Sequence, residues 1–161
     1  MSEQPKTMEQ RMKENLNGDL LTNALDFLAY MDETDGYSHL GENICFIDCD
    51  PEHLYIFFHL SSVVCKNDVD FSPISEELKT FAWSHVNQCN HYRTNGTACG
   101  CGQQPGHSVT ILDRKFDNMC NCFICIHNPD AQTFAKTKAL IEACKVCIAK
   151  TKVGTMCEYN Y

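Results

Sequence analysis

No apolar stretch in this sequence is long enough to cross a membrane. The longest, residues 54–65, is interrupted by His59, Ser61 and Ser62, whereas a membrane-spanning helix needs about 20 apolar residues. Residues 1–19 are polar throughout and contain no apolar segment before a small-residue cleavage site, so they do not match a secretory signal. These absences predict a soluble, cytoplasmic protein that does not bind membranes.

Basic residues are scarce in the first half of the chain. Residues 1–78 contain four Lys/Arg and sixteen Asp/Glu, a net charge of −12, and the rest of the chain carries +4. The only basic run is in the last predicted helix, where the lysines are expected to form a solvated face. Affinity for nucleic acid comes from clustered Lys and Arg. The protein is therefore not expected to bind nucleic acid, and its partner is expected to be a small molecule or a protein that the sequence does not identify.

The common catalytic motifs are also missing. The sequence has no Gly-x-Ser-x-Gly, no phosphate loop, no dinucleotide fingerprint and no His-Glu-x-x-His. No set of serine, histidine and carboxylate residues indicates a catalytic centre. The residues therefore leave open whether the protein is an enzyme.

The residues that are present predict a globular α+β fold. Apolar residues make up 43% and charged residues 21% of the chain, as in ordinary globular proteins. Apolar residues recur at helical spacing in residues 20–31, and capping signals start helices at Ser72-Pro73 and Asn128-Pro129-Asp130. Strands are predicted for residues 43–49, 53–64, 109–116 and 121–127, with a turn at Asp50-Pro51-Glu52. Strands that are neighbours in sequence favour an antiparallel sheet of four to five strands, with N-terminal, middle and C-terminal helices packed on it.

Domain boundaries follow from the same segments. Residues 1–18 are predicted to be a flexible extension, residues 19–152 a single domain and residues 153–161 a tail. Inside the domain, residues 90–106 contain mostly Gly, Asn, Thr, Gln and Cys and have no periodicity. So long a stretch without secondary structure indicates a functional loop or one that is ordered by an ion.

The chain contains twelve cysteines, and several of them lie in or beside this stretch. Without an export signal, reduced thiols are expected rather than disulfides. Cys99-Gly100-Cys101-Gly102 places two thiols on a glycine-rich turn, and tetrahedral Zn²⁺ requires four such donors. The predicted structural zinc ligands are Cys89, Cys99, Cys101 and Cys120, with Cys122, His91 and His107 as substitutes. A closed site of four thiolates would be structural and would make the protein a zinc-stabilised binding or interaction module.

Three alternatives use the same segment, residues 89–122. A reactive cysteine beside His91 or His107 would make the protein a thiol-based redox or catalytic protein. An iron–sulfur cluster is a weaker alternative to zinc, and an open site with three protein ligands and water would make the ion catalytic. The Cys-x-Cys pairs are a weaker metal signal than a duplicated Cys-x-x-Cys, because their short span makes chelation of one ion by both thiols less common. These cysteines could also be small apolar filling residues, since free cysteine is often buried.

Cysteines and histidines outside the segment are expected to be structural. Cysteines in predicted strands or on the inward side of the last helix are expected to pack in the core: Cys45, Cys49, Cys65, Cys125, Cys144 and Cys147. His85 is expected to be a partnered histidine of the second helix. His53 and His59 lie on one face of a predicted strand and are a weak candidate for a second site.

Several motifs together resemble a group of small bacterial proteins. They are Trp83-Ser-His-Val-Asn-Gln-Cys89, Pro105-Gly106, Thr110-Ile111, Lys115-Phe116-Asp117-Asn118-Met119-Cys120 and Asn128-Pro129-Asp130-Ala131. In that group a tryptophan-bearing helix leads to closely spaced cysteines, a short strand, Asn-x-Cys and a terminal helix opened by Asn-Pro-Asp-Ala. The similarity covers about residues 20–148 and departs at an apparent insertion, residues 93–98. It implies the cysteine site and the α+β architecture, and it implies no activity.

Overall fold

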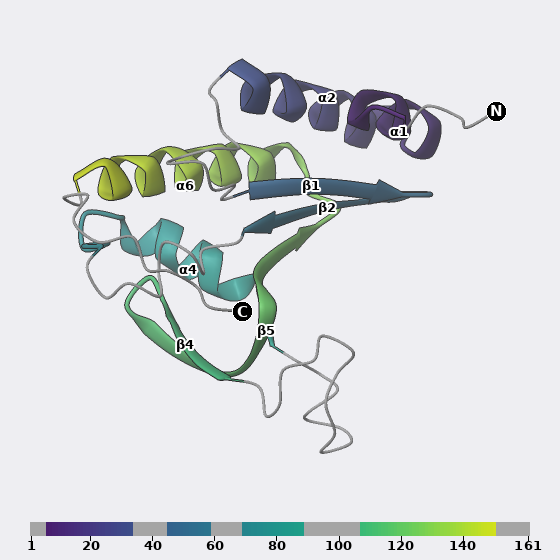
Figure 1. The fold of residues 1–161 in the computed structure, drawn as a ribbon. Helices are drawn as coiled ribbons and strands as arrows, with labels where there is room; N and C mark the ends of the chain where they lie inside the picture. Colours follow the sequence, from purple (N-terminus) through teal and green to yellow (C-terminus); the bar gives the residue numbers. More distant parts are fainter. Residues whose placement is uncertain (1–5, 34–44, 59–68, 89–106, 151–161) are drawn as a thin grey trace.

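A computed structural model describes residues 6–33, 45–58, 69–88 and 107–150 of the chain, except for the side chains of His107, Asn118 and residues 120–123. Its elements, in chain order, are α1 (Met8–Asn15), α2 (Gly18–Glu33), β1 (Cys45–Asp50), β2 (His53–Phe58), α4 (Glu76–Ser84), β3 (Val86–Gln88), β4 (His107–Ile111), β5 (Arg114–His127) and α6 (Ala131–Lys150) (Figure 1).

The strands form one antiparallel sheet in the order β1-β2-β5-β3, with β4 paired to β5. The long strand β5 organises this sheet, because β2, β3 and β4 all pair with different parts of it. β1 and β2 form a hairpin whose turn contains Pro51 and Glu52, and Glu52 takes a positive φ of 69°. This confirms the turn predicted at Asp50-Pro51-Glu52.

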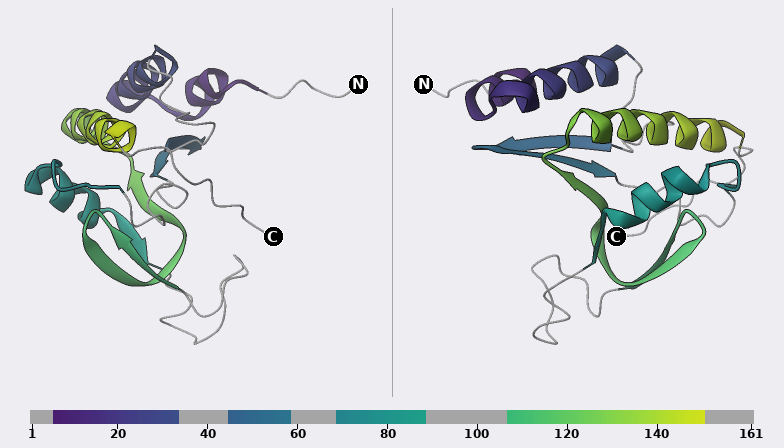
Figure 2. Two further views of the ribbon diagram at one scale, coloured as in Figure 1. Left: turned by 60° about the vertical axis from the view of Figure 1, so that its left-hand side comes forward. Right: turned by 180° about the vertical axis from the view of Figure 1, so that it is seen from behind.

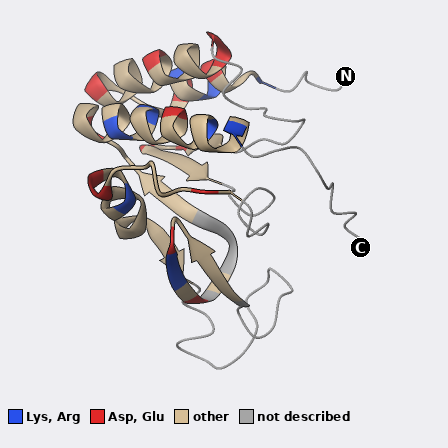
Figure 3. Ribbon diagram, turned by 90° about the vertical axis from the view of Figure 1, so that its left-hand side faces the viewer, with Lys and Arg blue, Asp and Glu red and all other residues tan. Residues whose placement is uncertain are grey.

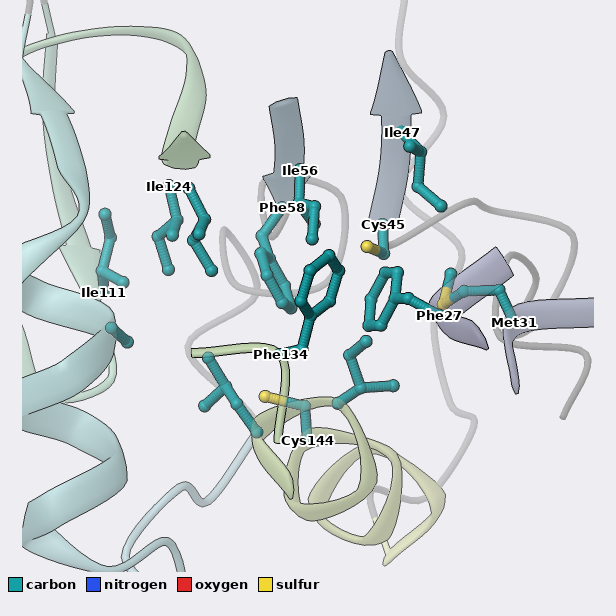
Figure 4. Packing of buried hydrophobic residues seen from close by; sticks show 14 of the residues in the cluster. Phe27, Met31, Cys45, Ile47, Ile56, Phe58, Ile111, Ile124, Phe134 and Cys144 are labelled. Atoms are coloured by element: carbon teal, nitrogen blue, oxygen red, sulfur yellow. The ribbon is translucent and has the colours of Figure 1, made fainter. Parts of the chain in front are cut away.

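The helices cover one face of the sheet, as the left-hand view in Figure 2 shows. Alternate residues of β1 and β2 point toward them, since burial follows the two-residue period of a strand. Phe27 of α2 and Phe134 of α6 lie 5.4 Å apart between ring centroids and pack in the same core as Phe58 (Figure 4). The predicted fold class is therefore confirmed: an antiparallel sheet with N-terminal, middle and C-terminal helices packed on it.

Part of the segment predicted to be a flexible extension is a helix. Thr7 and Gln10 form a capping box at the start of α1, each side chain accepting a hydrogen bond from the other residue's backbone N–H. Met12 is 0% exposed and belongs to the core. Arg11 donates hydrogen bonds to Asp48 at 2.6 Å and to the carbonyl of Cys49 at 2.7 Å, which attaches α1 to strand β1. Residues 8–15 therefore belong to the folded domain.

The middle helix α4 begins three residues later than the cap predicted at Ser72. Asp70 accepts a hydrogen bond from the N–H of Ser72, and this local turn competes with a helix start there. Ser75 is the N-cap instead, and its hydroxyl accepts from the N–H of Leu78. The helix ends at Ser84, and the short strand β3 follows, which periodicity did not predict.

The second hairpin turns within the segment predicted as one strand. Leu112 and Asp113 both take positive φ values, 47° and 69°, between β4 and β5. The turn is attached to α4, because Lys79 contacts Asp113 at 2.7 Å and the indole N–H of Trp83 donates to the carbonyl of Ile111 at 2.8 Å. Contacts with α4 thus hold a turn that lacks the usual glycine or asparagine.

Two lysines of α6, whose basic positions Figure 3 colours blue, pair with acidic residues of neighbouring helices. Lys136 pairs with Glu77 of α4 at 3.1 Å, and Lys138 pairs with Asp26 of α2 at 2.6 Å. Among the described residues, no helix is long and apolar enough to span a membrane.

Candidate metal centre

The described structure includes only part of the predicted metal site. Cys89, Cys99, Cys101 and His91 lie outside the described residues. The backbone of Cys120 and Cys122 lies in β5 and that of His107 begins β4, but their side chains are outside the described set. The structure therefore gives the backbone frame around the predicted ligands and not their contacts.

The two residues that flank segment 89–106 pair with the same residue of the sheet. Gln88, the last residue of β3, and His107, the first of β4, are both register partners of Met119. Because a strand has one neighbour on each edge, Gln88 and His107 flank β5, about 10 Å apart at the usual strand spacing. Cys120 follows Met119 directly, so a predicted ligand lies in the strand between the two ends.

Strand β5 is irregular where it carries these cysteines. The two-residue step from Val86 to Gln88 in β3 is matched by a five-residue step from Met119 to Ile124 in β5. The extra residues include Cys120 and Cys122. Bulges of this kind bend a strand and redirect side chains, and they are common next to functional sites. A regular strand would instead point Cys120 and Cys122 to the same face.

The cysteines predicted to be structural are buried where the structure describes them. Cys45, Cys49, Cys144 and Cys147 are at most 3% exposed and belong to the core, which confirms the prediction for these four. Burial raises the pKa of Cys45 and of Cys144 to about 12. They therefore stay protonated at neutral pH and are poor nucleophiles and poor metal ligands. Cys125 is half-buried in β5, and Cys65 lies outside the described residues.

Among the described residues, no group of three or more His, Cys, Asp or Glu side chains is arranged to hold a metal ion. His85 has the structural role predicted for it: its Nδ1 lies 2.8 Å from the carbonyl of Phe81, and its ring packs on that of Phe81 at 4.7 Å. The partner proposed for His53, His59, lies outside the described residues.

His53 instead has a different histidine beside it. Its ring stacks on that of His127 with centroids 5.1 Å apart, and His127 also stacks on Tyr55 at 5.0 Å. Asp50 lies 3.0 Å from Nδ1 of His53. Sequence analysis missed His127. The signal that could have identified it is the pairing of β2 with β5, which places His127 opposite Tyr55.

Two surface hollows lie elsewhere on the described part of the chain, with volumes of about 470 and 620 Å³. The first is lined by residues of α4 and by Lys136, and the second lies where α2 and α6 begin. Neither has a cysteine or histidine among its described lining residues, so neither extends the candidate site.

Comparison of the chain with protein-family models, with curated proteins and with solved structures finds no significant match.

Proposed function

We propose that this chain is a small cytoplasmic binding or interaction module that holds one structural zinc ion with Cys89, Cys99, Cys101 and Cys120. The resemblance to the bacterial group is in keeping with such a site but supplies no activity. The proposal therefore rests on this chain's own residues.

The observation that carries the proposal is the shared register of Gln88, Met119 and His107. Cys89 follows Gln88, and consecutive Cα atoms are 3.8 Å apart, so covalent geometry keeps Cys89 near β5 at the level of Cys120. Segment 89–106 must leave and return at this level. An ion bound by Cys99 and Cys101 would then tie the segment to the strand that carries Cys120.

The chemistry of the remaining cysteines supports the same assignment. Cys45 and Cys144 are free thiols in the core whose raised pKa values disfavour the thiolate that zinc requires. Segment 89–106, in contrast, consists mostly of polar residues and glycine, a composition that does not favour cysteines as apolar filling residues. Metal binding gives those thiols a physical role.

The test is elemental analysis of the full chain, purified anaerobically and without a metal-binding tag. About one zinc per chain is expected. The double variant Cys99→Ser with Cys101→Ser should lose the metal and unfold at lower denaturant, because metal-binding free energy contributes to folding. Cys125→Ser is the matched control, since Cys125 lies five residues along β5 from Cys120, and it should keep the metal.

Full metal occupancy in the double variant would refute this set of ligands. A metal-free wild-type protein in which Cys99 or Cys101 alkylates rapidly at neutral pH would favour the thiol-based redox or catalytic alternative.

A further inference from the structure

One face of the sheet is not covered by any described helix. Figure 2 shows the helices together on one side of β1, β2 and β5. The residues of these strands that point to the other side are exposed or half-buried, and we call this side the open face. It comprises Phe46, Asp48, Asp50, His53, Tyr55, Phe57, Cys125 and His127.

Two imidazoles lie side by side on the open face. His53 comes from β2 and His127 from β5, and their stacked rings have centroids 5.1 Å apart at an interplanar angle of 29°. Two nitrogens that bind the same zinc ion lie at most about 4.2 Å apart, because each metal–nitrogen bond is about 2.1 Å long. Each nitrogen binds along a lone pair in the plane of its ring, so stacked rings with centroids at 5.1 Å can share an ion once the exposed ring of His127 turns about its side-chain bonds.

Asp50 selects the tautomer of one of the two rings. Its Oδ1 lies 3.0 Å from Nδ1 of His53. An ionised carboxylate only accepts hydrogen bonds, so Nδ1 must carry the hydrogen and Nε2 keeps its lone pair in the neutral ring. This is the arrangement in which metal-binding histidines occur: one nitrogen on the ion and the other donating to a carboxylate.

Tyr55 contacts both His127 and Asp50. Its ring stacks on His127 at 5.0 Å, and its hydroxyl donates to Oδ2 of Asp50 at 3.4 Å. The side chain of His53 is 46% exposed and that of Asp50 54% exposed, so an ion can reach them from solvent. Asp50 thus holds His53, and both rings can be reached from solvent.

We propose that His53 and His127 together bind a divalent transition-metal ion on the open face, with Asp50 holding His53 in the metal-binding tautomer. Imidazole nitrogen suits Zn²⁺, Ni²⁺ and Cu²⁺ rather than Mg²⁺ or Ca²⁺. Two protein ligands leave the other coordination positions to water, so this is an open site that exchanges its ion. It is separate from the zinc site proposed for the cysteine segment.

The test is a Ni²⁺ titration of the full chain as purified, followed by the imidazole NMR signals of its histidines. Paramagnetic Ni²⁺ broadens signals close to it. The signals of His53 and His127 should broaden together below one equivalent of ion, and that of His85 should stay sharp, since its ring contacts Phe81 on α4.

Three variants separate a shared site from two independent histidines. His53→Gln should raise the Ni²⁺ concentration that broadens His127 at least tenfold, and His127→Gln should do the same for His53. Asp50→Asn should raise it about tenfold with both rings present, because the carboxylate strengthens its histidine as a ligand. Asp48→Asn is the matched control: Asp48 lies on the same strand and face but pairs with Arg11, so the change should stay below twofold.

Unchanged broadening of His127 in His53→Gln would overturn the proposal. So would sharp His53 and His127 signals after Ni²⁺ has bound to thiols, and that outcome would leave the zinc site of the cysteine segment unaffected.

Discussion

Asn128 joins β5 to α6, and its side chain continues the sheet for one more residue. Its Oδ1 accepts a hydrogen bond of 2.7 Å from the N–H of Leu54, and its own N–H donates to the carbonyl of Leu54 at 2.9 Å. Its amide nitrogen also donates to the carbonyl of Glu52 at 3.3 Å. Asn128 has a φ of 44°, in the left-handed region. Asparagine both tolerates this backbone and supplies the acceptor.

Asn128→Ala removes the acceptor and keeps the strained backbone. Leu54 is 0% exposed, so water does not easily replace the lost bond. A buried N–H without a partner costs about 1–3 kcal/mol. Alanine also lacks the polar side chain that makes the left-handed region tolerable for asparagine, which costs a further 1 kcal/mol or so. We expect the free energy of unfolding to fall by about 2–4 kcal/mol, a large part of the ~5–15 kcal/mol of a typical domain.

Urea unfolding followed by the fluorescence of Trp83, the single tryptophan, measures this change. Two matched variants separate its causes. Asn128→Asp keeps the acceptor and should cost less than about 1 kcal/mol. Asn128→Gly loses the acceptor but relieves the backbone, so it should be about 1 kcal/mol more stable than Asn128→Ala. A loss below about 0.5 kcal/mol in Asn128→Ala would refute the reasoning.

Two further predictions concern titratable groups. Cys45 and Cys144 should resist iodoacetamide in the native protein at pH 8 and react only after denaturation, because burial raises the pKa of each thiol to about 12; rapid native labelling, read by mass spectrometry, would contradict this. Hydrogen bonds from Thr133 lower the pKa of Asp130, so the unfolded state takes up a proton first as pH falls. Stability from this cap is present above about pH 4 and is lost as pH drops through the lowered pKa. Asp130→Asn should therefore reduce the fall in urea midpoint between about pH 6 and pH 3. If the midpoint falls as much as in the wild type, Asp130 does not contribute to the loss of stability in acid.

Local signals predicted the longer elements well. Helix α2 and helix α6 follow from apolar periodicity and nearby caps, although Asp130 rather than Asn128 caps α6 through its bond to Thr133. Asn128 was misassigned because its partner, Leu54, is 74 residues away in sequence. Local capping rules contain no information about such a partner.

The turn at Leu112–Asp113 and the short strand β3 were missed for a related reason. Leucine is an unusual residue at positive φ, and contacts with Lys79 and Trp83 of α4 hold this turn. β3 has only three residues and exists through its pairing with β5. Both features depend on tertiary contacts that outweigh local preference.

The sequence by itself determined the α+β class, the inward faces of the main helices and the burial of four core cysteines, because hydrophobic periodicity and residue size act locally. It also identified the cysteine segment as the candidate zinc site. Only the tertiary structure decided that Gln88 and His107 meet at Met119, and that His53 lies beside His127. Strand register decides both, since a register brings together residues that are distant in the chain and a shift of one residue would turn His127 to the opposite face.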